Sequence, residues 1–108
     1  MSAKIRNNVT IRGTSGTPML FAHGFGCDQS MWRHVAPAFE SDHQVVLFDN
    51  VGAGGSDPAA YNRTKYGTLQ GYADDVIEIC HELGLRNAVF VGHSVSAMIG
   101  VLAAIKEP

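Results

Sequence analysis

The stretch that decides the fold is AVFVGHSVSAMIG, residues 88–100. Its first four residues, 88–91, are apolar and predict a buried strand, and the small apolar residues after the serine predict a buried helix. A serine on such a strand-to-helix turn needs small residues two positions away on each side, because larger ones would collide where the chain folds back. Gly92 meets this rule. Ser96 replaces the usual second glycine, and it is still small enough to fit.

Ser94 is therefore the candidate nucleophile of this turn. A helix that begins at Val95 would direct its free backbone N–H groups and the positive end of its dipole at the serine. The alternative is a serine that only caps the helix beside an incidental glycine, since such short patterns also occur by chance. The order of strand, turn and helix favours the catalytic interpretation, because a nucleophile elbow requires that context.

A second candidate element is the loop His23-Gly24-Phe25-Gly26, which follows an apolar run at 19–22. Glycines let the main chain approach a substrate closely, so Phe25 N–H and Val95 N–H are the expected donors of an oxyanion hole. One such donor is worth about 3 kcal/mol of transition-state stabilisation. The other interpretation is a plain flexible turn. We expect His23 to pack near this loop and orient it.

The remaining pattern alternates strands and helices. Apolar or alternating runs predict strands at 8–12, 19–22 and 45–48 in addition to 88–91. Apolar residues on one face predict helices at 28–39 and 69–83, and small apolar residues predict a buried helix at 95–105. This alternation over short connections implies an α/β fold, with a mostly parallel sheet and helices on both faces.

The predicted helix ends carry recognisable signals. Asp28 or Ser30 can cap the helix at 28–39, and Pro37 should disturb its last turn. The helix at 69–83 should begin near Thr68 and end at Gly84. The face that the first of these helices should bury comprises Met31, Trp32, Val35, Ala36 and Phe39.

Other chemistry-bearing residues have structural interpretations. The segment GAGGSD, residues 52–57, superficially resembles a dinucleotide loop, but Pro58 follows it and no helix is expected there. We expect a structural turn, held by hydrogen bonds from its backbone to Asp49. Cys27 lacks an activating base and is expected to be a small buried residue.

The histidines give neither a base nor a metal site. His34 and His81 are expected on solvated helix faces, and His43 in a loop. His93 should point away from the neighbouring serine hydroxyl. The five histidines lack metal-ligand spacing, so no metal site is expected.

Composition narrows the partners and the compartment. The chain has 108 residues, is 45% hydrophobic and carries a net charge of −2, which suits one globular domain. It has no Lys/Arg cluster for nucleic acid or an anionic membrane, and no apolar run approaching the ~20 residues of a membrane span. Two cysteines and an N-terminus unlike a signal peptide predict a reduced, cytoplasmic protein.

Three motifs together resemble one family. FGCDQS (25–30), DNVGAG (49–54) and VGHSVSAMIG (91–100) are similar to the α/β-hydrolase subgroup that contains the bacterial stress regulator RsbQ and the plant strigolactone and karrikin receptors. The resemblance implies Ser94 as nucleophile, Phe25 and Val95 as oxyanion hole, and no metal or organic cofactor. It also implies a small hydrophobic ligand under a helical lid. For an RsbQ-like protein, the partner would be a PAS-domain serine phosphatase that acts in activating a stress sigma factor.

The resemblance also exposes a departure. In this fold the triad acid and base follow the serine, yet the 14 residues after Ser94 contain no Asp and no His. We therefore expect residues 1–108 to be a partial domain, the N-terminal half of the fold without the lid, the acid and the base. Such a chain should be nearly inert as a hydrolase. Its apolar strand at 88–91 would lack a neighbour, so the isolated chain should be insoluble, molten or dimeric.

Two function classes remain, with a third possibility beside them. The first is a serine hydrolase acting on an ester or lactone-like substrate, either as an RsbQ-like protein or as a generic esterase. The second is a ligand-binding regulator or receptor in which hydrolysis is secondary. The third is a functionless remnant of such a protein.

Overall fold

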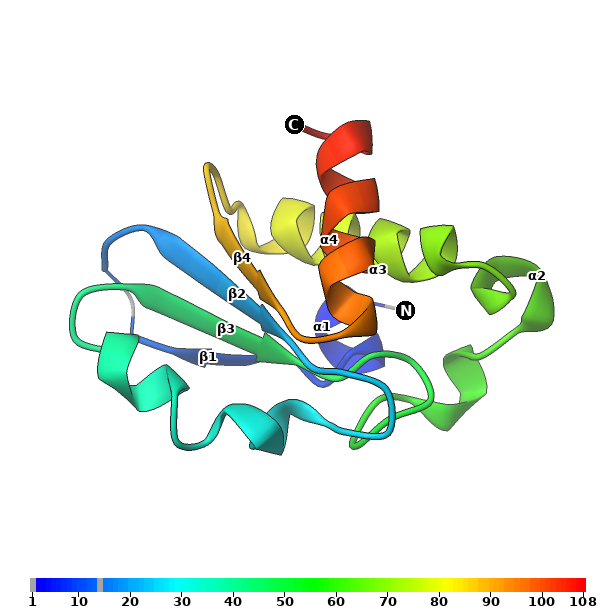
Figure 1. Cartoon of the computed structure of the whole chain (residues 1–108), viewed down its shortest axis with the longest axis horizontal. Coiled ribbons are helices and arrows are strands. Elements are labelled where there is room, and N and C mark those ends of the chain that lie inside the picture. Colours follow the sequence, from blue (N-terminus) through cyan, green and yellow to red (C-terminus); the bar gives the residue numbers. More distant parts are fainter. Residues whose placement is uncertain (1, 14) are drawn as a thin grey trace.

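The computed structural model describes residues 2–13 and 15–108. In these residues four strands form one sheet: β1 (Thr10–Arg12), β2 (Pro18–Ala22), β3 (Gln44–Phe48) and β4 (Val89–Gly92). The strand order is β1-β3-β2-β4 (Figure 1). β2 runs parallel to both β3 and β4, whereas β1 is antiparallel to β3. The predicted α/β class with a mostly parallel sheet is thereby confirmed.

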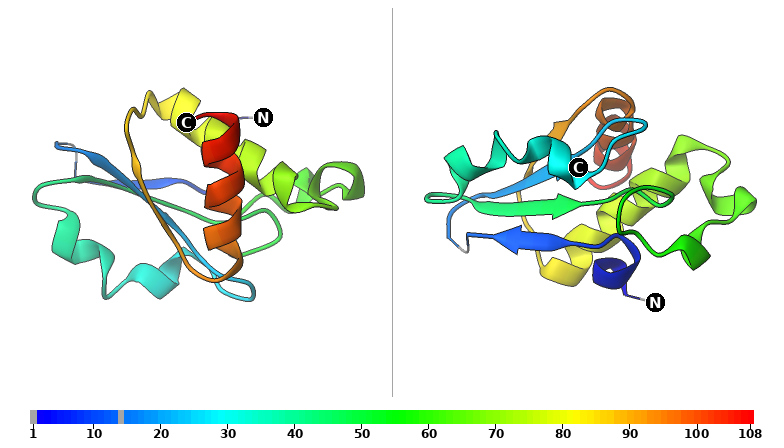
Figure 2. Two further views of the ribbon diagram at one scale, coloured as in Figure 1. Left: turned by 45° about the horizontal axis from the view of Figure 1, so that its top comes forward. Right: turned by 90° about the horizontal axis from the view of Figure 1, so that it is seen from below.

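Two long helices cover one face of the sheet. α3 (Leu69–Leu83) and α4 (Val95–Lys106) pack against each other there (Figures 1 and 2). Apolar side chains of both helices meet those of the central strands in one core, which includes Leu20, Val46, Phe48, Ile79 and Ile99. α3 ends as predicted, because Gly84 adopts a left-handed backbone with φ 66°.

The opposite face differs from the prediction. Instead of one helix at 28–39, two 3₁₀ segments lie there, η1 (Gln29–Trp32) and η2 (Ala36–Phe39). Asp28 caps the first segment by accepting a hydrogen bond from Ser30 N–H at 2.8 Å. Pro37 has no N–H to donate to the preceding turn, so an α-helix is interrupted there. Val35, expected in the core, is 44% exposed.

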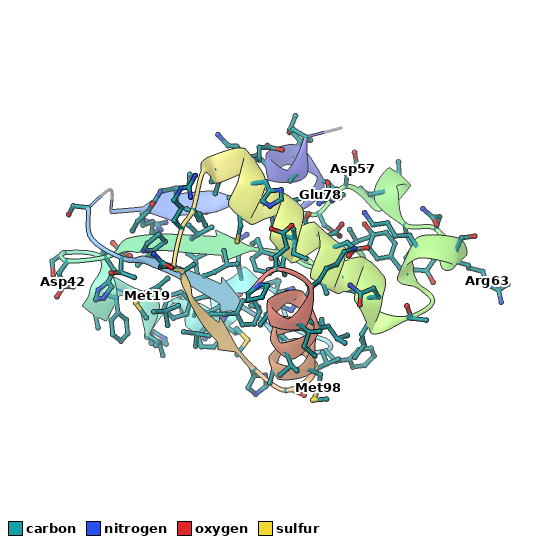
Figure 3. The ribbon with its side chains drawn as sticks, turned by 90° about the horizontal axis from the view of Figure 1, so that it is seen from above. Met19, Asp42, Asp57, Arg63, Glu78 and Met98 are labelled. Atoms are coloured by element: carbon teal, nitrogen blue, oxygen red, sulfur yellow. The ribbon has the colours of Figure 1, made fainter. Side chains whose placement is uncertain are left out.

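β4 and α4 are less covered than their composition predicts. The composition of both indicates burial, although the strand was also expected to lack a neighbour on one edge; Val89 is 45% exposed and Ile105 73%. Met98, labelled in Figure 3, projects from the outer side of α4. Within the described residues β4 is the outermost strand on its side, and no described element packs beyond it. The prediction of a buried helix at 95–105 is therefore wrong for its outer face.

The chain begins with an element that the sequence analysis did not anticipate. α1 (Ala3–Arg6) packs against α3, and its Arg6 is buried. The Arg6 guanidinium lies 3.1 Å from the Asp75 carboxylate. α2 (Arg63–Tyr66) adds Lys65, 2.7 Å from the same carboxylate, and the Tyr66 hydroxyl, which donates to it at 2.8 Å. Burial and this bond raise the pKa of Tyr66 well above its ordinary value.

Among the described residues, no helix has both the length and the apolar character required to cross a membrane.

Candidate functional site: an elbow and a glycine loop

Ser94 occupies a sharp turn between β4 and α4. Its backbone has φ 59° and ψ −122°, a region that residues other than glycine rarely adopt. Such strain persists only where the surrounding structure over-determines it, and it concentrates at functional sites. A Cβ atom at Gly92 would lie 2.7 Å from the Ser96 carbonyl oxygen, which explains the glycine two residues before the serine. Ser94 itself is exposed. Its role as nucleophile stays a prediction.

The glycine loop lies directly beside this turn. It follows β2, which is parallel to β4, and the register pairs Ala22 with Gly92 at the ends of the two strands. Carboxyl ends of neighbouring parallel strands meet at one edge of the sheet, where ligands of open α/β sheets bind. The two segments also touch. His93 N–H donates to the Ala22 carbonyl at 3.0 Å, and the His93 ring occupies the space that a Cβ of Gly24 would need.

The two N–H groups predicted to form the oxyanion hole have no hydrogen-bond acceptor among the described residues. Among residues 2–13 and 15–108, neither Phe25 N–H nor Val95 N–H donates a hydrogen bond to another protein group. Val95 begins α4, and the first N–H groups of a helix have no partner within it. Phe25 is 93% exposed on the loop. Both N–H groups are therefore free to bind an external oxygen, although their role as oxyanion donors stays a prediction.

The side chain of His23 fixes how the Phe25 N–H is presented. His23 is 2% exposed, and its Nε2 accepts a hydrogen bond from Asn50 N–H at 2.9 Å. A backbone N–H can only donate, so Nδ1 carries the ring proton and donates to the Gly24 carbonyl at 2.8 Å. That carbonyl and Phe25 N–H belong to one planar trans peptide, so fixing the oxygen also fixes the direction of the N–H. This geometry agrees with the expected orienting role of His23.

Asp49 anchors the other side of the loop. It is 1% exposed, and its Oδ1 accepts from Gln29 N–H at 2.8 Å. Its Oδ2 accepts from Gly55 N–H and from Asn8 Nδ2, both at 2.9 Å. The predicted structural role of Asp49 is therefore confirmed. The turn at 52–57 opens into a short 3₁₀ segment, η3 (Pro58–Ala60), where no helix was expected, and Asp57 caps it.

The other histidines form surface contacts. His34 is exposed and lies in the turn between η1 and η2, not on a helix. His43 Nδ1 lies 3.1 Å from Asp42, and His81 Nε2 lies 2.9 Å from Glu107. In the part of the chain that the structure describes, no three His, Cys, Asp or Glu side chains are grouped as metal ligands.

The two cysteines are free thiols. Cys27 was expected to be buried but is half-buried in the loop after β2. Cys80 is also half-buried, on α3, and burial raises the pKa of its thiol. A raised pKa lowers the thiolate fraction at neutral pH, so Cys80 is poorly suited to nucleophilic chemistry.

A general base for Ser94 is not evident in this arrangement. Both ring nitrogens of His23 are engaged, so its imidazole cannot take the serine proton without losing a contact that shapes the loop. Residues 95–108 contain no Asp and no His. The site as described thus combines a strained serine with two free N–H groups.

The sequence analysis missed two residues of this site. Asn50 follows β3, and its main chain and side chain contact His23 and Ser96 respectively. Ser96 was judged only for its small size, yet its hydroxyl donates to the His23 carbonyl. A polar residue at the end of an apolar strand was the available signal for Asn50. The hydrogen-bond partners of both residues could not be predicted, because they are brought together only where β2, β3 and β4 end at one edge of the sheet.

The strand order and the elbow define the class of protein, and the comparison with known families agrees. Residues 17–108 match the alpha/beta hydrolase fold family, and the chain belongs to it. It is 49% identical over 102 residues to a karrikin insensitive 2 receptor of Petunia hybrida. It is 46% identical over 101 residues to a strigolactone esterase of Arabidopsis thaliana. Each alignment covers 94% of this chain and 38% of the relative.

A solved structure gives the same result. A hydrolase from Oleispira antarctica superimposes with a TM-score of 0.93 at 44% identity, over 97% of this chain and 38% of that one. The chain therefore spans about two fifths of the length of these relatives. The chain is thus homologous to proteins named as plant karrikin insensitive 2 receptors and strigolactone esterases. Similarity to RsbQ in particular remains an expectation from the sequence motifs.

Proposed function

We propose that this chain carries the nucleophile and the oxyanion hole of a serine hydrolase acting on a small hydrophobic ester or lactone. The observation that carries the proposal is the strained, positive-φ backbone of Ser94, placed beside a loop with a free N–H. The exposed ring of Phe25 offers apolar contact for a ligand at the same edge of the sheet. No metal or organic cofactor is part of the proposal.

The chemistry follows from this placement. Ser94 Oγ attacks the acyl carbon, and the carbonyl electron pair moves onto the oxygen, which accepts hydrogen bonds from Phe25 N–H and Val95 N–H. Expulsion of the alcohol oxygen leaves an acyl-enzyme, and water then hydrolyses it to release the acid. The proton of the serine passes to a base and then to the leaving oxygen.

The base and the acid imply a longer protein. In this fold both follow the serine in the chain, and residues 95–108 contain neither His nor Asp. We propose that residues 1–108 form the N-terminal part of a larger hydrolase domain whose remainder supplies the lid, the acid and the base. The relatives support this, since the chain covers 38% of their length.

A second candidate function is a ligand-binding regulator. The relatives named as karrikin insensitive 2 receptors, at 41–49% identity, favour it. In this alternative the same edge of the sheet holds a small hydrophobic ligand, and contact with a partner matters more than turnover. The sequence motifs extend it to an RsbQ-like stress regulator in the cytoplasm with a PAS-domain serine phosphatase as partner.

The decisive experiment replaces Ser94 in the product of the whole reading frame. We expect Ser94→Ala to lower turnover of p-nitrophenyl acetate by at least about a thousandfold, because the attacking oxygen is removed. Ser41→Ala, at an exposed serine before β3, is the matched control and should keep full activity. Unchanged turnover in Ser94→Ala would refute the nucleophile. Lost turnover with intact signalling would favour the regulator.

A further inference from the structure

Three buried polar side chains connect the glycine loop to the elbow: His23, Asn50 and Ser96. Ser96 is 0% exposed and lies in the first turn of α4, directly after the predicted donor Val95. Its Oγ donates to the His23 carbonyl oxygen. Asn50 Nδ2 donates to the same Oγ at 3.4 Å, so the hydroxyl both gives and receives a bond.

These bonds act on consecutive peptide groups. The His23 carbonyl belongs to the peptide before Gly24, and Ser96 holds it. The next peptide contains the Gly24 carbonyl, held by His23 Nδ1 at 2.8 Å and by Cys27 N–H at 3.1 Å. Its N–H is that of Phe25, the donor predicted on the loop. Because a peptide group is planar, two consecutive peptides that are both anchored leave little freedom to the N–H of the second one, which is that of Phe25.

We propose that Ser96 is a positioning residue of the oxyanion hole, because its hydroxyl links the start of α4 to the peptide that precedes the loop donor. This inference rests on the proposed function. Val95 N–H is one residue from Ser96 along the helix, and Phe25 N–H is two residues from His23 along the loop. The bond between Ser96 and His23 is therefore a short connection between the two donors, and it sets their separation.

The usual glycine at this position could not make that connection. A buried hydroxyl is costly unless it is hydrogen-bonded, and Ser96 has both of its bonds satisfied within the protein. The Ser96 backbone itself lies against Gly92, where an added Cβ would be 2.7 Å from the Ser96 carbonyl oxygen. Serine thus satisfies the steric requirement of the elbow and adds a polar contact to the neighbouring loop.

The test compares two buried serines in the product of the whole reading frame. Ser96→Ala removes the link, whereas Ser56→Ala removes a hydroxyl of similar burial that accepts from Gly52 N–H at 3.2 Å in another turn. Because small misplacements of catalytic groups are costly, we expect Ser96→Ala to lower kcat for p-nitrophenyl acetate about 10- to 100-fold, with KM within about twofold. Ser56→Ala should keep kcat within about twofold of the unmodified protein.

A second measurement reports the loop without catalysis. Amide hydrogen exchange of Cys27 and Asn50 follows the two N–H groups that bond to Gly24 and His23. We expect exchange to accelerate in Ser96→Ala and to stay unchanged in Ser56→Ala. If Ser96→Ala also lowers the melting temperature, this exchange measurement still tests whether the Ser96 bond holds the loop.

The outcomes separate this inference from the function on which it rests. Unchanged kcat in Ser96→Ala, an equal loss in Ser56→Ala, or unchanged exchange would overturn the positioning role while the hydrolase proposal stands. A rise of KM alone would also overturn it. An unmodified protein without any esterase activity would remove the hydrolase function, and with it this role.

Discussion

The two long helices of this fold show opposite relations to the sheet. α3 packs its apolar side on the sheet, with Ile79 at 0% exposure, and Gly84 caps its C-terminal end. α4 is more apolar in sequence, yet Met98, Val101 and Ile105 remain more than half exposed. α3 thus lies against the core. α4 instead lies at an open border, the side of the sheet where β4 is the outermost described strand. The candidate site lies at the end of the strand that precedes α4, on that border.

The difference teaches that the local geometry of the elbow needs few neighbours. Ser94 keeps its strained, positive-φ backbone although β4 is half-exposed and has a sheet partner on one side only among the described residues. The contacts that hold it come from the glycine loop and from the first turn of α4. The lack of a neighbour beyond β4 therefore leaves the outer face of α4 exposed, but it does not change the backbone of the turn at Ser94.

The largest expected effect concerns the border itself. Residues 1–108 expressed alone should associate or lose fixed tertiary packing, because β4 leaves an apolar strand edge unpaired beside the exposed face of α4. Analytical ultracentrifugation and near-UV circular dichroism measure this. A monomer with a sharp two-state thermal transition would contradict the prediction.

Next in size is a pair of isoleucine truncations. Ile79→Ala, at 0% exposure, should lower the free energy of unfolding by about 2–5 kcal/mol, since it leaves a cavity in the core. Ile105→Ala, at 73% exposure in residues 1–108, should change it by no more than about 0.5 kcal/mol unless the proposed remainder of the domain packs on the outer face of α4. Urea titrations of the whole reading-frame product give both values. Equal losses would mean that the outer face of α4 is covered there.

A smaller effect, on stability at alkaline pH, is expected from the contacts of Asp75 with Arg6 on α1 and with Lys65 and Tyr66 on α2. Tyr66 donates to Asp75, and burial together with this bond raises the pKa of Tyr66. A group with a raised folded pKa adds stability below its unfolded pKa, about 10 for tyrosine, and that stability is lost as the pH rises through the folded value. Unfolding curves between pH 8 and about 11 should therefore decline with pH, and Tyr66→Phe should flatten this decline. An unchanged slope in Tyr66→Phe would contradict the assignment.

The smallest effect is expected from the ion pair that joins the two helices. Lys106 Nζ lies 2.9 Å from Asp74 Oδ1, and this bond lowers the pKa of Asp74. A lowered folded pKa means that the contribution is present above the unfolded pKa and lost as the pH falls through the folded one. Because the pair is substantially exposed, Asp74→Asn should cost no more than about 1 kcal/mol at neutral pH and less in high salt. A salt-independent loss would indicate a buried contact instead.

Several elements could be predicted because their signal is local. The helix at Leu69–Leu83 and the strands at 19–22 and 45–48 follow directly from apolar periodicity and from Gly84. The segment at 28–39 could not be resolved by periodicity alone, since Pro37 and the cap at Asp28 divide it into two 3₁₀ turns. α1 was missed because four residues carry no period, and its Arg6 is held by Asp75 and Glu78 on a distant helix.

The sequence by itself determined the elements that carry the site, because small residues around Ser94 and glycines around Phe25 permit only certain turns. Only the tertiary structure decided how those elements are held together. His23, Asn50 and Ser96 meet since three parallel strands end at one edge of the sheet, and no spacing in the chain encodes that meeting. Tertiary structure also decided the exposure of α4, because burial depends on which neighbours cover a helix as well as on how apolar it is.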